Sequence, residues 1–244
     1  MAAGKGKIER IEKNLQEVRR NIAEACGRAG RNPRDVTILA VTKSADLDAV
    51  KTIVDLGLTD LGESQAQQLT DRAGQLAAYL ERRRSELAGN VRWHMVGHLQ
   101  RNKVKLVLEV SNIVHSVDSL RLAEALNDRA GLLGRKVDVL LEVNCSGEAQ
   151  KHGVAVGAAL HLAELVCTLK NLHLVGLMTM AALTRNPQTA RPAFSRLREV
   201  FEEIRHEKIG GDSFRHLSMG MSQDYPVAVE EGATILRIGT ALFK

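Results

Sequence analysis

The sequence predicts a single (β/α)₈ barrel, the TIM barrel fold, with an extra helix before the first strand. Short apolar runs alternate with segments of helical periodicity along the 244 residues, and only four prolines interrupt them. Strands and helices that alternate over short links form parallel βαβ units. Eight such units in about 210 residues fit a closed barrel better than an open sheet. Because no linker or change of composition divides the chain, we expect one domain over residues 1–244.

The chain opens with a helix predicted at 8–29. Its apolar residues recur at spacings of three and four, which is one helical stripe; they are Ile8, Ile11, Leu15, Val18 and Ile22. Glycines at 27 and 30 favour its end. The next apolar run, 37–42, is continuous and not alternating, as expected for a strand that is buried on both faces.

The same unit then recurs along the chain. Further strands are predicted at 60–62, 91–96, 113–117, 137–144, 172–178, 216–219 and 235–238. Helices are predicted between them at 47–56, 66–87, 103–110, 119–132, 156–169, 193–204 and 223–231. The last strand ends close to the final residue of the sequence, so we expect no eighth helix after it. The N-terminal helix is predicted to cover that side of the barrel.

Composition excludes several classes of protein. The net charge is +5, and the basic run at 82–84 has no aromatic residues around it, which argues against a nucleic-acid groove. No apolar stretch approaches the roughly 18 residues of a membrane span. The three cysteines are widely spaced, which indicates reduced thiols and a cytoplasmic protein. Neither GxGxxG nor GxxxxGK[ST] occurs, so nucleotide-driven chemistry is unsupported.

A lysine follows the first strand. In a barrel the functional residues lie at the carboxyl ends of the strands, and Lys43 comes directly after the apolar run. Burial there would disfavour the charged form of Lys43 and leave a free amine able to attack an aldehyde. The alternative is a lysine that reaches solvent, as most do.

Small and hydroxylated residues follow the seventh and eighth strands, where this fold usually binds phosphate. The two turns are 217–222, Leu-Ser-Met-Gly-Met-Ser, and 237–240, Arg-Ile-Gly-Thr. Ser218 and Thr240 offer hydroxyl donors, and Ser222 could cap the following helix. Two tight turns and a helix cap are the structural alternative. Since strands one, seven and eight neighbour each other in a closed barrel, this cradle and Lys43 should converge on a phosphorylated aldehyde.

Arg237 lies in an otherwise apolar strand, where an unpaired guanidinium would be costly. A salt bridge to Glu63 or Glu142 would satisfy it. Alternatively it donates to the ring nitrogen of a pyridine cofactor. Because arginine does not give up its proton, that nitrogen would stay unprotonated and the ring would be a poor electron sink.

The chain resembles the pyridoxal-phosphate homeostasis proteins of the YggS/PROSC type over nearly its whole length. The most specific matches are Trp93-His94-Met95-Val96-Gly97-His98-Leu99-Gln100-Arg101-Asn102-Lys103 and Leu217-Ser218-Met219-Gly220-Met221-Ser222. Shorter matches are Ala40-Val41-Thr42-Lys43, Leu61-Gly62-Glu63, His115-Ser116-Val117-Asp118, Lys151-His152-Gly153, Gly176-Leu177-Met178 and 237–243.

The resemblance implies a barrel similar to the N-terminal domain of alanine racemase, with pyridoxal 5′-phosphate (PLP) held as a Schiff base on Lys43. It also implies Arg237 at the ring nitrogen. Around the phosphate it places Ser218, Met219, Gly239 and Thr240. Where the family usually has Asn after Gly-Glu, near the cofactor, this chain has Ser64, whose shorter side chain could loosen the contact with the ring.

Two functions follow from these predictions. The first is intracellular PLP homeostasis, in which the protein carries the cofactor, has no dedicated catalytic activity, and could deliver PLP to PLP-dependent apoenzymes. The second is an amino-acid racemase, which needs a second acid/base opposite the lysine; neither Tyr79 nor Tyr225 is an obvious one. We expect a monomer without nucleic-acid or membrane partners. We also expect no metal site, since no third Cys, Asp or Glu ligand is expected to cluster near His94 and His98.

Overall fold

The computed structural model describes residues 2–84, 86–148, 151–182 and 185–244. Eight parallel strands form the barrel: β1 (Thr37–Val41), β2 (Asp60–Glu63), β3 (Arg92–Met95), β4 (Ile113–Val117), β5 (Val137–Asn144), β7 (Leu172–Met178), β8 (His216–Ser218) and β9 (Ile235–Ile238). A two-residue strand, β6 (Val154–Ala155), pairs with the end of β5. The β1–β9 and β4–β5 pairings complete the ring of strands, so the predicted barrel is confirmed.

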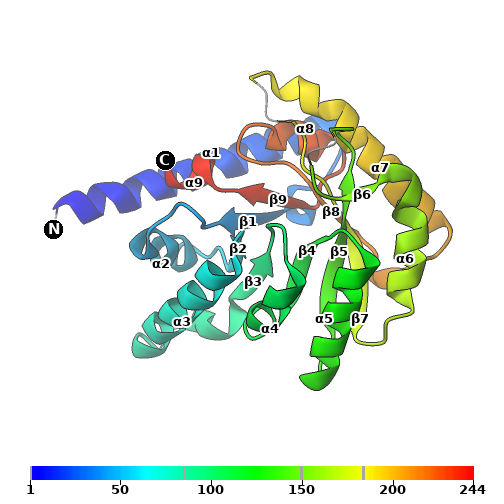
Figure 1. The fold of residues 1–244 in the computed structure, drawn as a ribbon. Coiled ribbons are helices and arrows are strands. Elements are labelled where there is room, and N and C mark those ends of the chain that lie inside the picture. The colour runs from blue at the N-terminus through cyan, green and yellow to red at the C-terminus, as the bar shows by residue number, and fades with distance from the viewer. Residues whose placement is uncertain (1, 85, 149–150, 183–184) are drawn as a thin grey trace.

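The helices surround the strands (Figure 1). They are α1 (Ala2–Ala29), α2 (Leu47–Asp55), α3 (Ala66–Arg82), α4 (Val104–Val107), α5 (Leu120–Leu132), α6 (Ala159–Cys167), α7 (Arg191–His206), α8 (Tyr225–Glu230) and α9 (Thr240–Phe243). Within the described residues, six short 3₁₀ segments supplement them, at 33–35, 86–90, 101–103, 156–158, 187–190 and 211–213. No helix in the described ranges combines the length and the apolar character that crossing a bilayer requires.

Three predictions about the helices were wrong. The helix predicted at 66–87 ends at Arg82, because Arg84 adopts a φ of 50° in the left-handed region. The segment 103–110 holds only one turn of α-helix after a 3₁₀ turn. A short helix, α9, does follow the last strand; its backbone turns back at Gly239, whose carbonyl accepts from the amides of Leu242 and Phe243.

The N-terminal helix covers the side of the barrel where the last strand ends, as predicted. In Figure 1, α1 runs beside α8 and α9, although these helices lie at opposite ends of the chain. Its apolar stripe is buried from Ile11 to Ile22, whereas Ile8 is exposed. The Asn14 side chain donates to the carbonyl of Leu242 at 3.1 Å, and Arg31 donates to the carbonyls of Val229 and Ala233. These contacts hold α8, α9 and the loop before β9 against the N-terminal segment.

Polar side chains occupy part of the barrel interior. The main apolar core joins the helices to the outer faces of the strands, and two small apolar clusters, one around Leu39 and one around Leu140, lie apart from it. Buried charged or polar residues on the strands include Glu63, His94 and His115. Groups of this kind are stable in a core only when they are hydrogen-bonded, and each of these three has a hydrogen-bond partner inside the barrel.

Gly176 gives a direct test of the β7–β8 pairing. A Cβ at this position would lie 1.9 Å from the carbonyl oxygen of His216, with which Gly176 is in register. We expect Gly176→Ala to lower the free energy of unfolding by about 3 kcal/mol or more, since backbone would have to move. Denaturant unfolding measures this.

The matched control is Gly74→Ala on the exposed face of α3, where an added Cβ meets nothing within 4 Å. Here the same substitution should stabilise the protein by about 0.5–1 kcal/mol through helix propensity. Equal effects at the two positions would contradict the close approach of β7 and β8.

Candidate functional site

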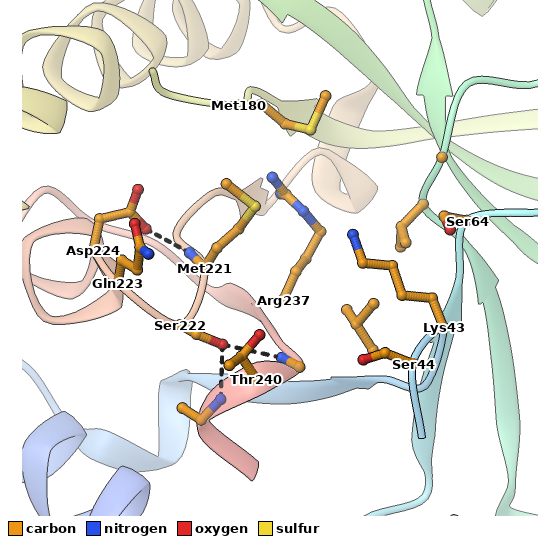
Figure 2. A pocket seen from close by; sticks show the side chains of 15 residues that line it. Lys43, Ser44, Ser64, Met180, Met221, Ser222, Gln223, Asp224, Arg237 and Thr240 are labelled. Carbon is orange, nitrogen blue, oxygen red and sulfur yellow. Dashed lines mark hydrogen bonds between the residues drawn. The ribbon is translucent and has the colours of Figure 1, made fainter. Parts of the chain in front are cut away.

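A cavity of about 570 Å³ opens at the carboxyl ends of the strands. This volume lies within the range of roughly 300–1,000 Å³ that is usual for small-molecule sites. Its wall comes from the segments after β1, β2 and β3 on one side and from the loops after β8 and β9 on the other, with Met180 after β7 between them (Figure 2). The site residues Lys43, Ser64, Arg237, Gly239 and Thr240 all line it.

Lys43 lies two residues beyond the end of β1. The backbone turns here, with the amide of Thr42 bonded to Gly62 and that of Ala45 bonded to Thr42. Figure 2 shows the Lys43 amine pointing into the cavity, toward the side chain of Arg237. The expected burial of Lys43 was wrong, because the strand ends at Val41 and the lysine stands exposed in the open mouth.

A buried carboxylate lies beneath this turn. Glu63, the last residue of β2, accepts a hydrogen bond from the Thr42 hydroxyl at 2.6 Å and pairs with Arg72 Nε at 3.1 Å. Burial raises the pKa of Glu63, and the Thr42 bond and Arg72 only partly oppose this shift. Arg72 also donates to the carbonyls of Thr42 and Ala45, so it stabilises the turn that carries Lys43.

The guanidinium of Arg237 is fixed by oxygen acceptors inside the barrel. It donates to the carbonyl and hydroxyl of Ser218 at 2.7 and 2.8 Å, and to the carbonyl of Thr179 at 2.9 Å. Burial lowers the pKa of Arg237 to about 10, which leaves it charged at neutral pH. The proposed salt bridges to Glu63 and Glu142 are absent among the described residues; Glu63 pairs with Arg72, and Glu142 acts on Arg237 only at longer range.

Two of the seven predicted site residues do not line the cavity. Ser218 is fully buried, and its hydroxyl bonds to Arg237 and to His115. Met219 is also fully buried in the main apolar core, and its amide donates to the carbonyl of Ile235. Both residues support the wall of the cavity from behind.

The loop after β8 contributes residues that the sequence analysis did not assign to a site. Met221, Gln223 and Asp224 line the cavity, and Asp224 Oδ1 accepts from the Met221 amide at 2.6 Å. Burial raises the pKa of Asp224. Met221 lies within the specific string 217–222, and Gln223 and Asp224 directly follow it, so an extension of that string by two residues would have included all three.

Ser222 has a different role from the predicted helix cap. Helix α8 begins at Tyr225 with Asp224 in the cap position. The Ser222 hydroxyl accepts hydrogen bonds from the amides of Gly239 and Ala241, at 3.3 and 3.0 Å (Figure 2). It thereby ties the β8 loop to the β9 loop, and two amide donors and two hydroxyls, including that of Thr240, gather at one wall.

Ser64 packs against the turn after β3. A Cβ at Gly97 would lie 2.2 Å from the Ser64 carbonyl oxygen, so only glycine fits there without movement. This close approach brings Ser64 and Gly97 together at the cavity wall.

His94 and His98, considered together in the sequence, lie in different places. His94 is buried in the barrel interior, whereas His98 is at the mouth with Asp118 and His152, and the potential ligand atoms of these three residues lie within 4.8 Å of one another. The statement that His98 has no third ligand nearby was therefore wrong. The His98 and His152 rings are stacked, with centroids 3.9 Å apart and planes 10° apart. Imidazole lone pairs lie in the ring plane, so the two rings in this arrangement do not direct their nitrogens to one ion.

Several known proteins are similar to this chain. A family model described as the alanine racemase N-terminal domain matches residues 13–244. The pyridoxal phosphate homeostasis protein of Pseudomonas aeruginosa is 40% identical over 235 residues, covering 96% of this chain and 94% of that protein. The protein of that name from Aquifex aeolicus is 37% identical, with 94% and 95% covered.

The chain belongs to the pyridoxal phosphate homeostasis protein family. A solved relative is PipY of Synechococcus elongatus with PLP bound, which is 30% identical with a TM-score of 0.74 and covers 91% of this chain and 100% of that one. The alanine racemase of Clostridium difficile shares the barrel at 15% identity and a TM-score of 0.69, and this chain covers 56% of it. That likeness concerns the fold alone, and it confirms the predicted similarity to the racemase N-terminal domain.

Glu142 gives a pH-dependent prediction. It is buried on β5, its Oε2 has no hydrogen-bond partner among the described residues, and burial raises its pKa to about 7. An unfolded glutamate titrates near pH ~4.3. The folded protein therefore binds this proton more tightly, and the stability from Glu142 is present at low pH and lost as the pH rises through 7.

We expect Glu142→Gln to become more stable relative to wild type by about 1–3 kcal/mol as the pH rises from ~5 to ~8. Unfolding in denaturant at several pH values measures the difference. Glu199→Gln, at an exposed position on α7 where Glu199 pairs with Arg196, is the control and should show a constant difference. A constant difference for Glu142→Gln as well would contradict the raised pKa.

Proposed function

We propose that this protein binds PLP in the cavity at the carboxyl end of the barrel, holds it as a Schiff base on Lys43, and serves intracellular PLP homeostasis. The observation that carries the proposal is the convergence of an exposed lysine amine, a fixed guanidinium and a group of hydroxyl and amide donors around one cavity. PLP has a matching set of groups: an aldehyde, a pyridine ring and a phosphate.

The donors of the β8 and β9 loops suit the phosphate. The hydroxyls of Ser222 and Thr240 line the cavity, and the amides of Gly239 and Ala241 already bond to a hydroxyl oxygen of Ser222. Phosphate oxygens are stronger acceptors than a hydroxyl, and bonds to charged acceptors contribute more. We assign the phosphate to Ser222, Gly239 and Thr240, with Ser218 and Met219 supporting the loop from behind.

Arg237 suits the ring nitrogen. Its guanidinium lines the cavity and is held by Ser218 and Thr179, so its direction is fixed before a ligand arrives. PLP supplies an electron sink in enzymes when its ring nitrogen is protonated. Arg237 keeps its own proton and would leave that nitrogen unprotonated, which favours storage of the cofactor over carbanion chemistry.

Lys43 forms the covalent link in this proposal. Its amine adds to the aldehyde carbon, and loss of one water molecule leaves a C=N bond that water can cleave again. Reversibility suits a protein that releases its cofactor, and PLP-dependent apoenzymes are the proposed recipients. Ser64 would contact the ring from the side of β2. We also propose that the protein is a single-domain monomer.

The racemase alternative has no support from the positions of the two tyrosines. The Tyr79 hydroxyl bonds to Asp55, and the Tyr225 hydroxyl accepts from Asn21 of α1 at 2.8 Å. Neither tyrosine lines the cavity. A two-base racemase needs an acid/base on each face of the cofactor, so the carrier function is the better proposal.

Lys43→Ala tests the covalent link. Wild-type protein incubated with PLP should show the visible absorption of a Schiff base, and Lys43→Ala should lose it because no other amine is assigned to the aldehyde. Lys43→Arg should also lose the band while keeping the charge. Lys51→Ala on α2, where Lys51 pairs with Asp48, is the control and should keep it. A colourless wild type would refute the proposal.

Thr240→Val tests the phosphate contact. Removal of one charge-assisted hydrogen bond should weaken PLP binding by about tenfold or more, because such bonds contribute roughly 1.5–3 kcal/mol. Binding of pyridoxal, which lacks the phosphate, should not change, and Thr240→Ser should behave as wild type. Fluorescence titration measures both ligands. Equal weakening for PLP and pyridoxal would place the phosphate elsewhere.

A further inference from the structure

A continuous chain of hydrogen bonds crosses the interior of the barrel. Arg237 Nη1 lies 2.8 Å from Ser218 Oγ, which lies 2.9 Å from His115 Nδ1. His115 Nε2 lies 2.9 Å from His94 Nδ1, and His94 Nε2 lies 3.0 Å from Asp60 Oδ1. The four links join side chains of β9, β8, β4, β3 and β2. Because β4 and β8 are not neighbours in the sheet, the His115–Ser218 bond spans the interior.

The two ends of the chain lie at opposite ends of the barrel. Arg237 lines the cavity at the carboxyl ends of the strands. Asp60 is the first residue of β2 and lines a second cavity, of about 230 Å³, together with Arg92 and His94. Since all the strands are parallel, this second cavity is at the amino ends. This series of hydrogen bonds thus connects the proposed cofactor site with the cavity at the amino ends of the strands.

The residues at the two ends fix the direction of donation along this series of hydrogen bonds. Arginine can only donate and an ionised carboxylate can only accept. Arg237 therefore donates to the Ser218 oxygen, and the Ser218 hydrogen must go to His115 Nδ1. His115 then carries its hydrogen on Nε2 and donates to His94 Nδ1. His94 in turn donates from Nε2 to Asp60. Both rings are neutral and both are Nε2–H tautomers.

The charges around the chain agree with this direction. Burial lowers the pKa of His94, and burial together with the nearby His94 and Arg237 lowers that of His115 well below its ordinary value. Burial would raise the pKa of Asp60, but hydrogen bonds from His94 and Arg92 outweigh it and the net shift is downward. With neutral His94 and His115 rings between the Asp60 anion and the Arg237 cation, every donor in this series of hydrogen bonds has an acceptor.

We propose that Asp60, His94, His115 and Ser218 act as positioning residues for Arg237, forming a one-way relay that holds its guanidinium toward the cofactor ring and directs the negative end of aligned dipoles at it. The tautomer part of this proposal concerns the protein alone. Its effect on the cofactor rests on the proposed function. The hydrogen bonds of the relay compensate the cost of burying a guanidinium that has no salt bridge within the described residues.

The tautomers are tested by ¹⁵N NMR of the histidine-labelled full chain without PLP, assigned with His94→Gln and His115→Phe. Between pH 6 and 8, the relay requires both rings to be neutral with the hydrogen on Nε2. A hydrogen on Nδ1 of either ring, or a charged ring in this range, would overturn the proposal whether or not the protein binds PLP.

The effect on the cavity is tested by a pH titration of the visible absorption of PLP-loaded protein. Breaking the relay removes the dipoles whose negative ends face Arg237, so the positive electrostatic potential of Arg237 in the cavity increases. The proton on the Lys43 nitrogen of the PLP-loaded protein is then lost at lower pH. We expect the midpoint to fall by about half a pH unit or more in His115→Phe. Ser218→Ala removes the same link with little change of volume and should shift the midpoint in the same direction.

The matched control is His173→Phe. His173 lines the same second cavity and lies 3.4 Å from Asp138, but it is outside the relay and half exposed. The midpoint of the visible-absorption titration of His173→Phe should equal that of wild type. Equal midpoints in all variants, or an equal shift in His173→Phe, would overturn the positioning role. Other charged or titratable groups around the relay stay unchanged in these variants: Arg92, Asp138, Arg215 and His216 at the Asp60 end, and Lys43, Glu142 and Asp224 at the cavity.

Discussion

The pairing of the first and last strands is the constraint on which the site depends. Four residues of β1, from Thr37 to Ala40, are in register with the four residues of β9. This pairing joins segments almost 200 residues apart in sequence and sets the turn after β1 beside the turn after β9. A Cβ on Gly239 would lie 3.1 Å from the Val41 carbonyl oxygen, so the two turns are nearly in contact. Without this closure, Lys43 and Thr240 would not line one cavity.

The second organising feature is a buried positive charge. Arg237 occupies a β9 position that is only 5% exposed, and an unpaired charge there would be strongly destabilising. The barrel supplies carbonyl groups, a serine hydroxyl and, beyond them, two neutral histidines that end on Asp60. This part of the polar interior therefore serves one requirement, a fixed cation at the wall of the cavity. An apolar interior would be simpler to pack, but it would leave the guanidinium without acceptors.

The sequence predicts the barrel well, because strand runs such as 37–42 and 137–144 are continuous and apolar and because helical stripes separate them. It also predicts that Lys43, Gly239 and Thr240 meet, since strand order in a closed barrel follows chain order. It does not predict which way Ser218 and Met219 face, because strand tilt and stagger decide which side chains reach the mouth. The relay and the cluster of His98, Asp118 and His152 were missed for a related reason: both depend on contacts between side chains of different strands and loops, which the sequence pattern does not specify. The exposure of Lys43 depends on the strand ending two residues earlier, which local pattern does not specify.

Borohydride reduction of PLP-loaded protein, followed by peptide mass spectrometry, tests the central claim most directly, since reduction fixes the cofactor to the nitrogen that holds it. The account predicts the added pyridoxyl phosphate on the peptide that contains Lys43. Its principal appearance on a different lysine, or on none, would contradict the convergence of the β1 turn with the β8 and β9 loops on one cofactor.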